Sequence, residues 1–327
     1  MRFVVYGAGA IGGVIGGRLF EHGHEVVLIA RGAHLDAIQR HGLQVASPAG
    51  TTTLDVPAVD HPGALSLTSD DVVIFAMKTQ HTADAARQLA ASAPPALRVV
   101  SAQNGVENER LLLRRFEHVY GICVMCPTGH LEPGVVDAYS APVTGLLDVG
   151  RWVGGTDEIT AAVARALRDS TFESEPRTDI ARWKYGKLLM NLGNAIEALC
   201  GPSQRGGSLM RLARSEAIEV LTKARIPFVD REEDRQRRGD LLTIAPIEGR
   251  PRGGGSSWQS LQRGTGNIEA DYLNGEIVLL GRMWGVDTPV NALLQRRAAR
   301  AAVDEMEPGS IQPAELLAEL GMDPEFR

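Results

Sequence analysis

The sequence predicts an α/β fold in its first half, a doubly wound parallel sheet of the Rossmann type, followed by an all-α C-terminal domain. A strand, a glycine turn, a helix and a second strand follow one another within about thirty residues, as in the unit that opens such a sheet. From about Asp179 the pattern changes to long helices. The length of 327 residues suits two domains, and we place the boundary to give domains 1–176 and 177–327.

The first half contains regularly spaced, β-rich apolar runs. Arg2–Tyr6 precedes a glycine-rich turn, a helical pattern that ends at Gly23, and a second strand at Glu25–Ala30. Further strands are expected at residues 71–76, 98–102 and 119–125. Alternating residues after Pro133 predict a hairpin-like section that extends to about residue 175.

The second half is helical. Ile180–Leu199 is strongly apolar, Ser208–Ala224 is amphipathic, and Asn267–Trp284 has the pattern of another long helix. The charge run Asp230–Asp240 is interpreted as a solvated helix face, and Arg252–Gly255 as a flexible loop.

Composition excludes several classes of protein. The net charge of -6 gives no reason to expect a nucleic acid or an anionic membrane as partner. No stretch reaches the roughly 18 uncharged apolar residues of a membrane helix, and the N-terminus lacks the pattern of a secretory signal. We therefore expect a soluble, cytoplasmic protein.

Two of the three cysteines, Cys123 and Cys126, form a C-x-x-C. The surrounding residues have the pattern of a buried strand, in which positions three apart point to opposite faces. We interpret the thiols as packing residues and predict no metal site; redox or metal chemistry is the alternative.

The glycine turn is the first candidate site. Gly7-Ala8-Gly9-Ala10-Ile11-Gly12 follows a strand and opens a helix, the context in which G-x-G-x-x-G binds a dinucleotide. Small residues let the backbone approach a pyrophosphate, whose charge the helix N-terminus meets. A purely structural turn is the alternative.

The end of the second strand indicates which dinucleotide binds. An NAD site places an acidic residue there, whereas this chain has Arg31. A cation can pair with a 2'-phosphate, so we predict NADP(H); otherwise Arg31 is a solvated cation. Lys78 and Asn104 follow later strands and are expected to reach the cofactor or the reacting carbonyl, with a loop role as the alternative.

Lysine is rare here, with four residues among 34 Lys and Arg. On a helix Lys187, Asn191 and Asn194 share one face. A partly desolvated lysine has a lowered pKa and becomes a competent general acid; a lysine that reaches solvent at a helix end is the alternative. Lys184, three residues earlier, is expected to be solvated near the domain boundary.

At this point the sequence resembles the ketopantoate reductase family over roughly residues 1–300. The matching residues are Gly7-x-Gly9-x-x-Gly12, Arg31, Lys78, Asn104-Gly105, Lys187-Leu-x-x-Asn191, Ser256-Ser257 and Glu269-x-Asp271-Tyr272-x-Asn274-Gly275.

The resemblance implies a site between the two domains, with Lys187 as proton donor. It implies that Asn191 and Ser257 hold substrate, that Asn104 contacts both cofactor and substrate, and that Glu269 lies near the nicotinamide ribose and positions Lys187.

The chain departs from this pattern after the lysine. Family members often have Asn-Pro eight residues on, where this chain has Ala195-Ile196. Asn194 is a candidate substitute for that asparagine among the substrate-binding residues, although its side chain projects about 100° around the helix from position 195. The tail from Pro308 has no assigned role.

Three functions follow. The first is NADPH-dependent reduction of 2-dehydropantoate (ketopantoate) to pantoate, in pantothenate and coenzyme A biosynthesis. The second keeps the chemistry with another 2-oxo acid or ketone, and the third is a non-catalytic NADP(H)-binding regulator. A homodimer is a possible assembly.

Overall fold

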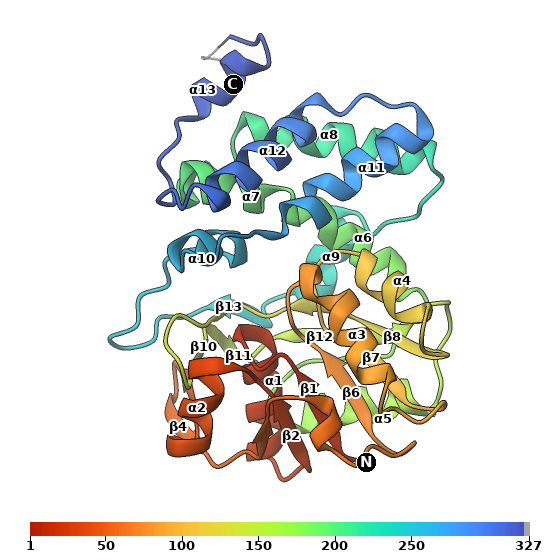
Figure 1. Ribbon diagram of the computed structural model, residues 1–327. Helices are drawn as coiled ribbons and strands as arrows, with labels where there is room; N and C mark the ends of the chain where they lie inside the picture. Colours follow the sequence, from red (N-terminus) through yellow and green to blue (C-terminus); the bar gives the residue numbers. More distant parts are fainter. Residues whose placement is uncertain (324–327) are drawn as a thin grey trace. The chain divides into compact units, whose positions relative to one another are not determined.

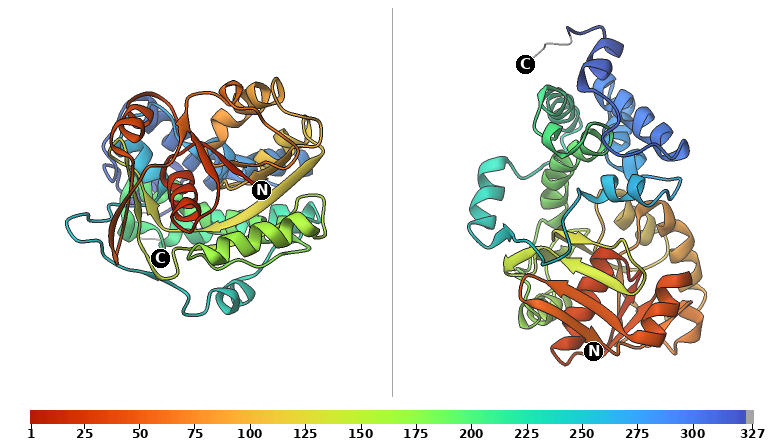
Figure 2. Two further views of the ribbon diagram at one scale, coloured as in Figure 1. Left: turned by 90° about the horizontal axis from the view of Figure 1, so that it is seen from below. Right: turned by 90° about the vertical axis from the view of Figure 1, so that its left-hand side faces the viewer.

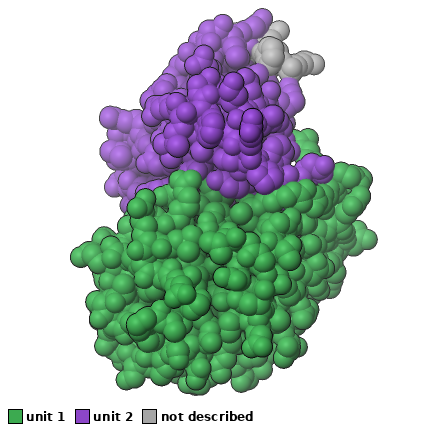
Figure 3. All heavy atoms as spheres, turned by 90° about the vertical axis from the view of Figure 1, so that its right-hand side faces the viewer, with its two compact units in different colours: residues 1–184, 231–252 green, residues 185–230, 253–327 purple. Residues whose placement is uncertain are grey.

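The computed structural model describes residues 1–323 and divides them into two compact units, coloured separately in Figure 3. The first unit contains Met1–Lys184 and Arg231–Arg252; the second contains Tyr185–Asp230 and the residues from Gly253 onward. This division differs from the sequence boundary at residue 177, because residues 177–184 and residues 231–252 pack with the first unit.

A seven-stranded sheet forms the centre of the first unit (Figure 1). Its order is β12-β8-β7-β6-β1-β2-β5, and every neighbouring pair is parallel except β12 with β8. The strands are β1 (Phe3–Tyr6), β2 (Val26–Ile29), β5 (Ala58–Val59), β6 (Val72–Phe75), β7 (Arg98–Ser101), β8 (His118–Met125) and β12 (Leu146–Arg151). The α/β fold predicted from the sequence is confirmed.

Helices cover both faces of this sheet, and a separate apolar core fills each side. One core contains side chains of α1 (Ala10–Glu21), α2 (Gly32–His41) and α5 (Glu158–Asp169). The other contains side chains of α3 (Thr82–Ala90) and α4 (Glu107–Leu113). Parallel strands that are buried on both faces are expected to be continuously apolar. Every residue of β1 and β6 is buried, and their sequences are Phe-Val-Val-Tyr and Val-Val-Ile-Phe.

The section expected to be hairpin-like contains a helix that the sequence analysis missed. α5 begins with a capping box, in which the Asp157 carboxylate accepts the Thr160 N–H and the Thr160 hydroxyl accepts the Asp157 N–H. Short strands precede the helix: β9 (Thr128–Gly129), β10 (Val135–Ala138) and β11 (Ser140–Pro142). β9 and β10 join β3 (Leu43–Ser47) and β4 (Gly50–Leu54) in a second sheet.

Residues 231–252 belong with the first unit because they pair with it. β13 (Leu242–Ile244) lies antiparallel to β11. On α9 (Arg231–Arg238), the Arg237 guanidinium donates to both carboxylate oxygens of Asp148, at 2.9 and 2.7 Å. Only 11% of the Arg237 side chain is exposed, so the interpretation of the whole charge run as a solvated face is wrong at this residue.

The second unit is helical, and Figure 2 shows it from two further directions. α6 (Ile180–Asn191) begins in the first unit and ends in the second. The other helices are α7 (Gly193–Cys200), α8 (Ser208–Lys223), α10 (Ser256–Gln262), α11 (Asn274–Trp284), α12 (Pro289–Val303) and α13 (Pro313–Glu319). Single 3-10 turns occur in the first unit at η1 (Pro62–Ala64) and η2 (Thr79–His81), and in the second unit at η3 (Pro202–Gln204) and η4 (Glu269–Tyr272).

An apolar core of the second unit includes part of the tail. Leu316 and Leu317 of α13 are buried in the same cluster as α7, α8 and α12. Leu316 and Leu317 therefore give the tail a packing role; residues 324–327 lie outside the described part of the chain.

Two expected helices are shorter than the sequence suggests. The first divides at Leu192, whose carbonyl accepts a hydrogen bond from Asn274 Nδ2 at 3.3 Å. The second starts at Asn274, because Leu273 has non-helical dihedrals and the preceding residues form η4. Leu192 keeps helical dihedrals, and its N–H still donates to the Leu188 carbonyl at 3.2 Å, so the first helix is interrupted there for one residue only.

The remaining sequence expectations concern cysteines, metals and membranes. Cys123 and Cys126 are free thiols that contact different carbonyls, those of Trp183 and Thr144. Within residues 1–323, no cluster of His, Cys, Asp and Glu has the arrangement of a metal site. None of the helices in this range has the length and apolar character needed to cross a membrane.

Candidate active site

A cavity of about 440 Å³ opens in the first unit where β1 and β2 end. Four residues predicted to bind the cofactor line it: Gly7, Ala8, Gly9 and Arg31. The lining residues that the sequence analysis did not single out are Tyr6, Ile29, Ala30, His34, Met77, His81, Asp84, Ala85, Gln88 and His130. Ala30 follows β2 and Met77 follows β6, so the rule that ligands bind beyond the carboxyl ends of parallel strands could have identified these positions.

The three glycines of the turn have different reasons to be glycine. Gly7 has φ +99°, and a Cβ there would lie 2.7 Å from the Met77 nitrogen. A Cβ on Gly12 would lie 2.1 Å from the Gly7 carbonyl oxygen. At Gly9 the nearest protein atom, on His130, would be 3.9 Å away. The fold therefore requires Gly7 and Gly12, whereas Gly9 leaves room within the cavity.

Gly9 also begins α1, and no side chain caps that helix end. The first N–H groups of a helix lack intrahelical partners and attract anions. Ala10 and Ile11 belong to this first turn but do not line the cavity. Gly9, at the uncapped start of this helix, does line it, and an uncapped helix N-terminus beside a cavity suits a phosphate group.

Arg31 carries a positive charge at the same cavity. Its Nη2 donates to Tyr6 Oη at 3.2 Å and to Gln88 Oε1 at 2.8 Å. Both acceptors are neutral, and no carboxylate in residues 1–323 forms an ion pair with Arg31. Burial raises the pKa of Tyr6, and the neighbouring guanidinium opposes this shift, so the phenol remains a neutral hydrogen-bonding group.

His34 fixes the glycine turn from the other side. Its Nδ1 accepts the Gly134 N–H at 2.8 Å, so Nε2 carries the proton and donates to the Ala8 carbonyl at 2.7 Å. Burial lowers the pKa of His34 and keeps the ring neutral. The His130 ring packs against it, with centroids 4.2 Å apart. No local sequence signal identifies His130, because β9 and β10 bring it here.

Lys78 and Asn104 lie on two loops that a buried polar network joins. Lys78 precedes η2, and Asn104 follows β7; neither residue lines the 440 Å³ cavity. Gln103 Nε2 donates to the Met77 carbonyl at 2.8 Å. Asn108 Nδ2 donates to the Asn104 carbonyl at 2.9 Å and to Thr79 Oγ1 at 3.1 Å. The network holds the loops after β6 and β7 in a fixed register.

The expectation of a solvated Lys184 is wrong. This residue is 3% exposed and belongs to the first unit. Its ammonium pairs with the Glu109 carboxylate and donates to the Gln103 carbonyl at 3.0 Å. The reason is long-range packing, since Glu109 lies 75 positions earlier in the chain.

In the second unit, α6 carries Lys187 and Asn191 four residues apart, and Asn194 follows on α7. Lys187 is half-buried, whereas Asn191 and Asn194 are 6% and 4% exposed. The Asn191 Nδ2 atom is buried and has no hydrogen-bond partner among the described residues. Since buried donors are nearly always paired, this one indicates a missing acceptor.

Ser257 lies on α10, which packs against α7, the helix of Asn194. Glu197 on α7 accepts the Gly255 N–H at 2.8 Å and pairs with Arg205, which fixes the start of α10. The sequence analysis missed this carboxylate. Glu269, buried at 5% exposure, lies in η4 rather than on a long helix.

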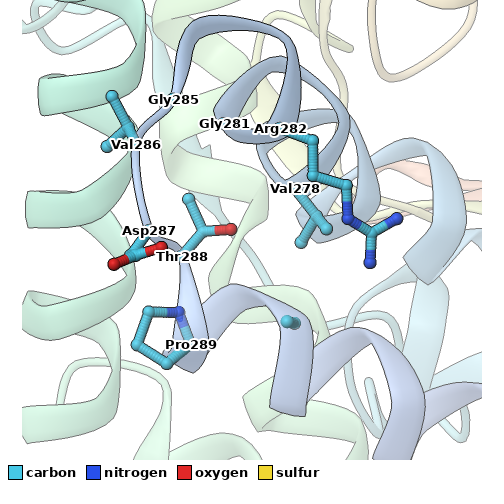
Figure 4. Close-up of a pocket in the computed structure, with 9 residues that line it drawn as sticks. Val278, Gly281, Arg282, Gly285, Val286, Asp287, Thr288 and Pro289 are labelled. Atoms are coloured by element: carbon cyan, nitrogen blue, oxygen red, sulfur yellow. The ribbon is translucent and has the colours of Figure 1, made fainter.

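A second cavity, of about 620 Å³, lies in the second unit between the end of α11 and the start of α12 (Figure 4). Arg282 and Asp287 are its charged lining residues, and their side chains point in different directions. None of the candidate residues Lys187, Asn191 and Glu269 lines it. We therefore do not assign catalysis to this cavity.

Comparisons with known proteins cover nearly the whole chain. A model of the family described as "Ketopantoate reductase PanE/ApbA" matches residues 3–152, and its C-terminal counterpart matches residues 179–301. The 2-dehydropantoate 2-reductase of Archaeoglobus fulgidus is 30% identical over 301 residues, covering 90% of this chain and 95% of that protein. The enzyme of the same name from Pyrococcus horikoshii is 28% identical over 308 residues, with 90% and 95% coverage.

Solved structures agree with the sequence relatives. A PanE/ApbA family ketopantoate reductase from Ralstonia eutropha superimposes with a TM-score of 0.78 at 28% identity, covering 93% of this chain and 99% of that one. Family matches, relatives and fold lead to the same conclusion: the chain belongs to the ketopantoate reductase family of oxidoreductases.

Proposed function

We propose that this protein reduces 2-dehydropantoate to pantoate with NADPH, in pantothenate and coenzyme A biosynthesis. One observation carries the proposal: Asn191, four residues after Lys187 on α6, has a buried donor without a partner among residues 1–323. The carboxylate or carbonyl oxygen of a 2-oxo acid would supply the missing acceptor. The relatives named above are 2-dehydropantoate 2-reductases.

The candidate residues have separate roles in this reaction. When bound, NADPH supplies a hydride to the 2-oxo carbon. Lys187 donates a proton to the oxygen that develops negative charge there, a contribution of roughly 10²- to 10⁴-fold for a general acid. The polar side chains of Asn191, Asn194 and Ser257 orient the substrate carboxylate and hydroxyl.

Three further residues serve the cofactor side. Asn104 contacts both cofactor and substrate, Lys78 binds the cofactor, and Glu269 contacts the nicotinamide ribose and orients Lys187. The burial of Glu269 supports an orienting role, because a buried carboxylate needs a partner.

Charge at the first-unit cavity supports NADP(H) over NAD(H). The cavity is lined by one arginine and one carboxylate, Arg31 and Asp84. Asp84 forms an ion pair with Arg87 at 2.9 Å, whereas in the described part of the chain Arg31 bonds only neutral oxygens. The uncompensated guanidinium fits a 2'-phosphate, and the turn Gly7–Gly12 fits the pyrophosphate.

The test is NADPH oxidation measured against a panel of 2-oxo acids. We expect ketopantoate to be turned over with kcat/KM of roughly 10⁴ M⁻¹s⁻¹ or more. If NADPH binds but no panel member is reduced, the chain is a non-catalytic NADP(H)-binding regulator and the proposal fails.

Ala195 favours a second candidate, reduction of a different 2-oxo acid or ketone. This residue is 2% exposed and packs in the apolar core of the second unit. It cannot supply the polar contact expected from the asparagine found there in many family members. Efficient turnover of another panel member, with ketopantoate inert, would select this candidate.

A further inference from the structure

The Lys184–Glu109 ion pair is a buried feature that the proposed chemistry does not use. The two side chains are 2% and 0% exposed. The Lys184 ammonium contacts Glu109 Oε1 and the Gln103 carbonyl, whereas Glu109 Oε2 is buried without a partner in the described part of the chain. One carboxylate oxygen is thus left unsatisfied in the protein interior.

An ion pair of this kind is a poor source of stability. Burying two charges costs desolvation free energy, and an apolar pair of similar volume is often as stable or more stable. The unsatisfied Oε2 adds to the cost. The contacts of the pair, rather than its own free energy, therefore suggest what it does.

Those contacts converge on the loop that carries Asn104. Lys184 holds the carbonyl of Gln103, the residue directly before Asn104. Asn108, next to Glu109 on α4, holds the Asn104 carbonyl at 2.9 Å. The ammonium and the amide thus fix two successive carbonyls, one on each side of the Asn104 α-carbon.

We propose that Lys184 and Glu109 are positioning residues, which hold the Gln103–Gly105 loop so that Asn104 presents its side chain to cofactor and substrate. The inference deepens the proposed function and rests on the role given there to Asn104. It also gives a function to the lysine one turn before Lys187. A misplacement of about 1 Å can cost on the order of 100-fold in rate.

The experiment is a double-mutant cycle between this pair and Asn104. Lys184→Met alone leaves Glu109 buried and unpaired and can prevent folding, so the variant used is Lys184→Met/Glu109→Gln, which removes both charges at nearly constant volume. We expect a thermal midpoint close to the wild-type value and a fall in kcat/KM of about tenfold to 100-fold. In an Asn104→Ala background the same two changes should lower kcat/KM less than about twofold, because their effect passes through Asn104.

A matched control uses an ion pair at the amino ends of two central strands of the sheet. Arg2 and Asp71 precede β1 and β6 and pair at 2.8 Å. Arg2→Met/Asp71→Asn should leave kcat/KM unchanged. Equal losses for the Lys184 pair with and without Asn104, or no loss at all, would overturn the inference.

Two further measurements separate this inference from the proposed function. The cycle is run with whichever panel acid the wild-type protein reduces, and in parallel on Kd for NADPH. If the wild-type protein leaves ketopantoate unreduced, the proposed function fails, while coupling in Kd or with another acid still supports the positioning role. With full ketopantoate turnover and additive losses, the positioning role alone fails.

Discussion

Arg31 is the residue at which cofactor choice can be tested most directly. Its guanidinium bonds Tyr6 and Gln88 and no carboxylate in the described chain, so its charge is available to a phosphate. We expect Arg31→Ala to weaken NADPH binding by about 1.5–3 kcal/mol, the range of a charge-assisted hydrogen bond, and to change NADH binding little. Fluorescence titration with both nucleotides measures this. Equal losses would show that Arg31 does not read the 2'-phosphate.

Lys187 is the residue to which we assign the proton. Lys187→Ala should lower kcat by roughly 10²- to 10⁴-fold while NADPH still binds, as expected for loss of a general acid. Steady-state kinetics and a nucleotide titration on the same preparation separate the two effects.

Lys223 at the end of α8 is exposed and supplies the control. Lys223→Ala should leave kcat unchanged. Full activity in Lys187→Ala would remove this lysine from the mechanism. Lys184 is unsuitable as a control, because its ammonium is buried against Glu109.

At the scale of elements, the turn between β1 and α1 makes opposite predictions for two of its glycines. Gly9→Ala should fold normally, since a Cβ there meets no protein atom within 3.9 Å, but it should weaken NADPH binding by occupying the cavity. Gly12→Ala places a Cβ 2.1 Å from the Gly7 carbonyl oxygen and should destabilise the fold itself. We expect a loss of about 1–3 kcal/mol from such overpacking.

Thermal unfolding and NADPH titration of both variants check this pair of predictions. A Gly9→Ala variant that binds NADPH as the wild type does would mean that the phosphate does not approach Gly9. A Gly12→Ala variant of wild-type stability would show that the turn relaxes around the added methyl group.

At the scale of the whole molecule, Arg237 is one of the contacts that hold residues 231–252 to the first unit, beside the pairing of β13 with β11. Arg237→Met removes two hydrogen bonds to Asp148, which keeps Arg177 and the Glu175 N–H as partners. We expect a loss of about 1–3 kcal/mol and faster hydrogen exchange within 231–252.

The neighbouring Arg235 is the control for that prediction, because 76% of its side chain is exposed. Arg235→Met should leave both stability and exchange unchanged. Unchanged exchange in Arg237→Met would show that the pairing of β13 with β11 holds the segment without the ion pair.

The sequence by itself determined the parallel sheet, the glycine turn, the position of Arg31 at the end of the second strand, and the helical second half. Each of these features has a local signal in the sequence: a hydrophobic period, the residues of a turn, or the end of a strand. It could not determine residues whose setting depends on distant partners. From the sequence, Lys184 is expected to be a solvated cation near the domain boundary. It is buried because it packs against Glu109, 75 positions away.

Tertiary structure likewise decided three other features. His130 reaches the cavity through a second sheet, Asn274 donates to the Leu192 carbonyl 82 positions earlier, and residues 231–252 pair with the first unit through β13 and Arg237. The physical reason is the same in each case: burial and hydrogen bonding between segments far apart in the chain fix these positions, and a local window of sequence contains only one of the two partners.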